Sequence, residues 1–122
     1  MFDTRDRRLG EPGLPLTVRF TRLTCGDCLV SVRGELDLST RSMFLAHMGL
    51  LLAQHRPRWV RLDLTGLTFC DCAGLRAIQA VDRLAGATHR VRVTAASQCV
   101  DLLLRMCHIE HLWGHRPACP AL

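Results

Sequence analysis

Apolar residues recur at two different periods along the chain, and the order of these periods limits the fold more than any other feature. Apolar and polar residues alternate, with the period of a β-strand, over 16–20, 29–33, 59–64 and 91–94. Apolar residues three and four positions apart, the spacing of a helix face, run through 39–55, 71–85 and 97–107. The sequence therefore predicts the element order β-β-α-β-α-β-α.

Turn and cap residues support these boundaries. Thr24–Asp27 has the composition of a tight turn, so the first two strands form a hairpin. Ser39 and Thr40 are N-cap candidates for the first helix, and Asp71 takes the same place before the second. Pro57 ends the first helix.

This order predicts an α/β fold. Strands joined by single helices pair in parallel through right-handed crossovers. We expect a small sandwich, with a mostly parallel four-stranded sheet, an antiparallel N-terminal hairpin strand and helices mainly on one face. The 122 residues correspond to one domain. We assign 14–113 to it, 1–13 to a flexible leader and 114–122 to an irregular tail.

Several finer details follow from the same patterns. We expect the second strand to end at Gly34 and a loop to cover 65–70. The apolar stripe of the second helix includes Leu84, and that of the third includes Cys107. Asp101 and Arg105 are spaced to pair on the outer face of the third helix. His108 and His111 fall at its end.

The charge and hydropathy patterns exclude several classes of function. The net charge is +5, but the arginines form no basic stripe, and no nucleic-acid-binding motif is present. No apolar run reaches the roughly 18–20 residues of a membrane span. The N-terminal residues lack the apolar core of a secretory signal. We therefore expect a cytoplasmic protein that binds neither nucleic acid nor membrane.

The seven cysteines are read as thiols, because an odd number without a signal peptide argues against a disulfide framework. Cys25 and Cys28 have the C-x2-C spacing of a zinc knuckle, but no second pair completes four ligands. Cys72 lies in the first turn of a helix, without a base to activate it as a nucleophile. Since phosphate-binding loops and H-E-x-x-H motifs are also absent, we predict a binding module without cofactor or metal rather than an enzyme.

Two motifs carry a resemblance to a known family. The first is VRGELDLST at 32–40, and the second is LDLTGLTFCDCAGL at 62–75. Together they resemble the STAS domain of bacterial anti-sigma factor antagonists, and the likeness covers about 14–113. Family members bind an anti-sigma factor that is a serine kinase, and thereby free its sigma factor. The kinase phosphorylates the serine after the second motif's aspartate, and the added charge breaks the complex.

The resemblance implies where a partner docks and where the chain departs from its family. It assigns partner binding to residues in and beside the two motifs: Asp37, Ser39, Thr68, Asp71, Cys72, Ala73, Gly74 and Arg76. Cys72 stands at the phosphorylated position, where a thiol is not a normal substrate of a serine kinase. Gly74 lets either a partner or a neighbouring strand approach closely.

Two hypotheses of different class remain. The first is an anti-sigma factor antagonist-like module for a GHKL-type serine kinase, which Cys72 makes insensitive to phosphorylation. The second is a scaffold, or a thiol or zinc sensor, that has lost kinase control and uses Cys25/Cys28 or Cys70/Cys72. Thr65 and Thr68 stay open as other phosphorylation sites, and a homodimer also stays open.

Overall fold

A computed structural model describes residues 6–9, 15–85 and 90–118. The predicted order of elements is confirmed. A hairpin of β2 (Leu16–Arg22) and β3 (Cys28–Leu36), closed through a short 3-10 turn, precedes α1 (Arg41–His55). The chain continues as β4 (Trp59–Cys70), α2 (Cys72–Ala85), β5 (Arg90–Ala96) and α3 (Gln98–Met106).

The sheet has one more strand than the sequence predicted. Its order is β1-β2-β3-β4-β5, with antiparallel pairing up to β3 and parallel pairing from β3 to β5. The additional strand, β1 (Asp6–Leu9), lies within the segment assigned to a leader and pairs along β2 at the sheet edge. The other leader residues lie outside the described part of the chain, as does Gly86, the proposed stop of α2.

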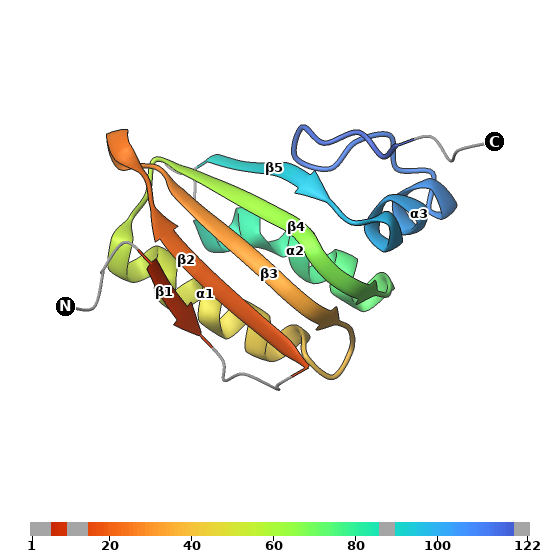
Figure 1. Ribbon diagram of the computed structural model, residues 1–122, viewed down its shortest axis with the longest axis horizontal. Coiled ribbons are helices and arrows are strands. Elements are labelled where there is room, and N and C mark those ends of the chain that lie inside the picture. Colours follow the sequence, from red (N-terminus) through yellow and green to blue (C-terminus); the bar gives the residue numbers. More distant parts are fainter. Residues whose placement is uncertain (1–5, 10–14, 86–89, 119–122) are drawn as a thin grey trace.

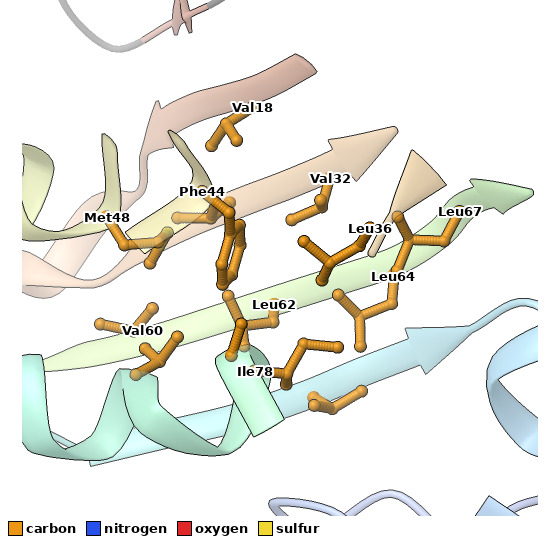
Figure 2. Close-up of a cluster of buried hydrophobic side chains, with 14 of the residues drawn as sticks. Val18, Val32, Leu36, Phe44, Met48, Val60, Leu62, Leu64, Leu67 and Ile78 are labelled. Atoms are coloured by element: carbon orange, nitrogen blue, oxygen red, sulfur yellow. The ribbon is translucent and has the colours of Figure 1, made fainter. Parts of the chain in front are cut away.

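The core lies between the sheet and the pair α1 and α2, which together cover one face (Figure 1). Strand side chains that alternate toward this face meet the apolar sides of both helices (Figure 2). The largest contributors, each at most 1% exposed, include Phe20, Phe44, Met48, Leu62, Leu64 and Ile78. Burial of one such side chain stabilises the fold by about 1.5–3 kcal/mol.

Two strands are longer than predicted. β3 continues past Gly34 to Leu36, and β4 continues through 65–70, where the sequence predicted a loop. The pairing of β3 with β4 shifts register between Ser31 and Arg33 and again between Gly34 and Glu35. Such irregularities break the strict alternation that marks a strand in a sequence. The sequence pattern therefore predicts a loop where the structure has the second half of β4.

Four details of α2, α3 and the segment after α3 differ from the prediction. Cys107 is exposed rather than packed in the stripe, and on α2 Leu84 is also exposed. Asp101 does not pair with Arg105, because its carboxylate accepts a 2.6 Å hydrogen bond from His115. α3 ends at Met106, so His108 and His111 follow the helix instead of extending it. In the predicted tail, 114–118 contain no helix or strand.

We expect Leu62→Ala to lower the free energy of unfolding by about 2–5 kcal/mol, because the cavity would lie at the centre of the core. Leu38→Ala provides the control, since this side chain is 64% exposed and its loss should cost less than about 0.5 kcal/mol. Urea denaturation of both variants measures the difference. Equal costs would contradict the placement of Leu62 in the core.

Candidate functional site

The two sequence motifs meet at one edge of the sheet. β3 and β4 are parallel neighbours, and their last residues, Leu36 and Cys70, are paired. Asp37 and Asp71 directly follow these residues, so both aspartates lie at the C-terminal ends of adjacent strands. Adjacent strands are about 4.8 Å apart, and the pairing therefore brings together segments that are 34 positions apart in sequence.

Asp37 organises the turn before α1. Its Oδ1 accepts hydrogen bonds from the backbone N–H and hydroxyl of Ser39, at 2.9 and 2.7 Å, and from the Thr40 N–H at 3.1 Å. These bonds, led by the Ser39 hydroxyl, hold the pKa of Asp37 below its usual value. The buried Thr40 hydroxyl donates to the Glu35 carbonyl and accepts from the Asp37 N–H. Thr40 therefore occupies the predicted N-cap position of α1 but makes no side-chain cap hydrogen bond, and the Asp37 carboxylate satisfies the Ser39 and Thr40 N–H groups just before the helix.

Asp71 begins α2 as the sequence predicted. Its Oδ1 accepts a 2.8 Å hydrogen bond from the backbone N–H of Gly74, three residues further on, which is the geometry of an N-cap. The Asp71 N–H in turn donates to the carbonyl of Leu36 at 3.4 Å. The start of α2 is therefore held directly to the end of β3.

Gly74 contacts the protein's own backbone. A Cβ atom at this position would lie 2.2 Å from the Leu36 carbonyl oxygen and 3.0 Å from the Cys70 sulfur. Of the two interpretations of Gly74, close approach of a neighbouring strand is the one that the structure supports. A larger residue such as arginine at this position would therefore disturb the fold itself, because its side chain has no space beside the Leu36 carbonyl.

Cys72 is the first residue of α2 and its thiol is exposed. Its thiol lies beside that of Cys107, which follows α3. Desolvation, and next the neighbouring Cys72 sulfur, raise the pKa of the Cys107 thiol. This proximity could not be predicted from the sequence, because the two cysteines belong to separate segments, 35 positions apart.

The remaining predicted residues lie around the same edge. Thr68 is exposed on β4 and its hydroxyl donates to the Gly34 carbonyl at 3.2 Å. Ala73 is half-buried and Arg76 is exposed, both in the first turns of α2. Of the eight predicted residues, seven thus have side chains near the surface of one strand-end region. The eighth, Gly74, packs against the backbone of Leu36 beneath that surface.

Two apolar side chains at this edge were not among the predicted site residues. Leu38, between Asp37 and Ser39, is 64% exposed, and Phe69, at the end of β4, is 48% exposed. Leu38 directly follows Asp37 and Phe69 is two residues before Asp71, so the apolar positions within the two motifs were the signal that could have identified them. We define the strand-end surface by its exposed and half-buried residues: Asp37, Leu38, Ser39, Thr68, Phe69, Asp71, Cys72, Ala73 and Arg76.

Two of the thiols proposed for a sensor, Cys28 and Cys70, are poorly placed for reaction. Burial raises the pKa of both Cys28 and Cys70 to about 12, and a buried thiol is inert. The side chain of Cys25 lies outside the described residues. Among the side chains that are described, no group of three His, Cys, Asp or Glu residues is arranged to hold a metal ion. None of the described helices is long and apolar enough to span a membrane.

Comparison with known proteins identifies the family. The model of the family described as "Mlab, STAS domain" matches residues 20–114. The chain therefore belongs to the STAS domain family, as its two motifs had indicated. A search of curated proteins found no match.

Three solved structures share the fold. An anti-sigma factor antagonist from Mycobacterium paratuberculosis is 22% identical with a TM-score of 0.71, over 90% of this chain and 92% of that one. The unphosphorylated anti-sigma factor antagonist SpoIIAA is 18% identical with a TM-score of 0.50, over 62% and 70%. The STAS domain of an antisigma-factor antagonist from Rhodobacter sphaeroides is 14% identical with a TM-score of 0.53, over 72% and 90%.

We expect Gly74→Ala to destabilise the protein by at least about 1–3 kcal/mol, because the added methyl group overpacks against the Leu36 carbonyl. Gly49→Ala is the matched control. A Cβ atom there meets nothing within 4 Å, so alanine should stabilise α1 by up to about 1 kcal/mol. Thermal and urea denaturation measure both changes, and an unchanged stability of Gly74→Ala would contradict the close approach of α2 to β3.

Proposed function

We propose that this protein is a non-catalytic regulatory module that docks through the strand-end surface on an anti-sigma factor of the serine-kinase type and so releases a sigma factor. The observation that carries the proposal is the meeting of both family motifs at one exposed edge. The three similar structures, all of anti-sigma factor antagonists, support it. The bacterial cytoplasm is the compartment in which such a partner and its sigma factor act.

The composition of the strand-end surface suits a protein partner. Leu38 and Phe69 provide exposed apolar area, and the hydroxyl and carboxylate groups of Ser39, Asp37 and Asp71 lie beside them. An apolar centre with a polar rim is the usual anatomy of a protein interface. The turn is also held in one conformation by the hydrogen bonds of Asp37, so little ordering would oppose binding.

Cys72 is the reason to propose an antagonist that its kinase does not switch off. It is exposed at the first turn of α2, where the family carries the phosphorylated serine. A phosphate would add about −1.5 to −2 charge next to Asp71, and the thiol offers no oxygen to accept it. Docking would then continue whether or not ATP is present.

The second hypothesis, a thiol or zinc sensor, has less support. It relied on pairs that include Cys28 and Cys70, and both thiols are buried with raised pKa values. The exposed thiols that do contact each other are Cys72 and Cys107. A binding module with a blocked phosphorylation site therefore accounts for more of the geometry.

Capture of a partner tests the docking proposal. We expect the tagged protein to retain a GHKL-type anti-sigma kinase from its native cytoplasm. Leu38→Glu should reduce capture by at least about tenfold, because it places a charge at the apolar centre of the interface. Leu50→Glu is the matched control, since Leu50 is 50% exposed on α1 and outside the strand-end surface. Mass spectrometry identifies the retained proteins, and equal capture by both variants would argue against this surface.

Phosphorylation tests the role of Cys72. With the captured kinase and ATP, the wild-type chain should accept no phosphate, whereas Cys72→Ser should accept one and lose affinity. Cys107→Ser, which makes the same change in the neighbouring thiol, should remain unmodified. Thr65 and Thr68 are exposed on β4, where their hydroxyls already donate to Asp63 and to the Gly34 carbonyl. Wild-type phosphorylation on either threonine, with loss of binding, would show that the switch has moved.

A further inference from the structure

We infer that a basic groove between α1 and α2 binds an acidic segment of the partner protein. The inference rests on the proposed function, because it describes the chemistry of the same partner. Three arginines line the groove, Arg41 from α1 and Arg76 and Arg83 from α2, and its apolar lining includes Leu45, Ala73 and Ala77. All three arginines are exposed.

The charge in this groove is not balanced by the residues that the structure describes. α1 contains no acidic residue, and α2 contains only Asp82. Asp82 directly precedes Arg83, and adjacent residues on a helix do not face each other. The carboxylate of Asp71 already binds the Gly74 N–H. In the described part of the chain, no carboxylate pairs with any of the three guanidinium groups.

The spacing of the arginines indicates the form of the acidic segment. Arg76 and Arg83 are seven residues apart, or about two helical turns, which places them roughly 10.5 Å apart along one side of α2. In an extended peptide, three residues span about 10 Å. Carboxylates at every third position of an extended segment therefore match the two guanidinium groups. The small alanines between them leave room for its backbone.

The groove is continuous with the strand-end surface. Arg41 follows the Asp37 turn directly, and Ala73 and Arg76 belong to both. A partner docked on the apolar centre at Leu38 and Phe69 would therefore also contact the adjoining groove. Apart from Arg76, which the two share, the strand-end surface carries the carboxylates and the groove carries the guanidinium groups, so the two together select a partner with the opposite arrangement of charge.

Nucleic acid is the less suitable anionic occupant. Single strands are bound by combining positive charge with aromatic side chains on which bases stack. Among the described residues, no aromatic side chain lines this groove. The occupant to which the inference commits is therefore a carboxylate-rich protein segment.

The test uses the full protein and a fluorescent nine-residue peptide with Glu at every third position. A peptide with Gln at the same positions and a single-stranded oligonucleotide of similar length serve as comparison probes. We expect the Glu peptide to bind more tightly than the other two, with an affinity that falls as salt rises. Absence of wild-type binding to the Glu peptide, or tighter binding of the oligonucleotide, would overturn the inference.

Charge reversal then separates the groove from the net charge. Arg83→Glu should weaken binding of the Glu peptide by about tenfold, as expected when a favourable charge pair becomes a repulsive one. Arg116→Glu, which changes the net charge equally but lies in the segment after α3, should weaken it less than about twofold. Arg41→Glu should act like Arg83→Glu, and it serves as the second groove variant if circular dichroism shows that Arg83→Glu is unfolded. Equal effects of the groove and control variants would overturn the inference.

The two proposals fail in different ways. The peptide titration needs no anti-sigma factor, so it stands even if no kinase is captured. If the kinase is captured and Arg83→Glu captures it as well as the wild type does, the groove inference fails and the proposed function remains. Arg83 is used here because Arg76 also belongs to the strand-end surface.

Discussion

The parallel pairing of β3 with β4 is the constraint on which the candidate site depends. It places Leu36 opposite Cys70, and both family motifs continue from these two residues. A shift of this register by one residue would turn the alternating side chains to the wrong face of the sheet. The core side chains Val30, Val32, Leu62 and Leu64 therefore fix the positions of Asp37 and Asp71 without contacting a partner.

A single carbonyl group connects this pairing to the second helix. The oxygen of Leu36 accepts a hydrogen bond from the Asp71 N–H and lies so close to Gly74 that no side chain fits there. With Asp71 also capping the helix, α2 begins at a defined point and direction relative to β3. The exposed position of Cys72 and the basic groove beside α1 follow from that placement.

Much of the architecture could be predicted because it depends on local chemistry. The alternation of Val60, Leu62 and Leu64 with polar residues predicted the central strand, and Asp71 predicted the start of α2. The prediction was wrong where tertiary contacts override a local pattern. Thr65 to Cys70 read as a loop but pairs with β3 through a register shift, and Asp6 to Leu9 becomes a strand only through its pairing with β2.

The sequence by itself determined the order of elements, the membership of the two motifs in one family and the substitution at Cys72. These are properties of residues that are close together in the sequence, so they do not depend on contacts between distant parts of the chain. Only the tertiary structure decided that Gly74 packs on Leu36, that Cys72 contacts Cys107 and that three arginines share one groove. Each of these contacts joins residues from separate elements, whose distance is fixed by sheet register and helix packing rather than by position along the chain.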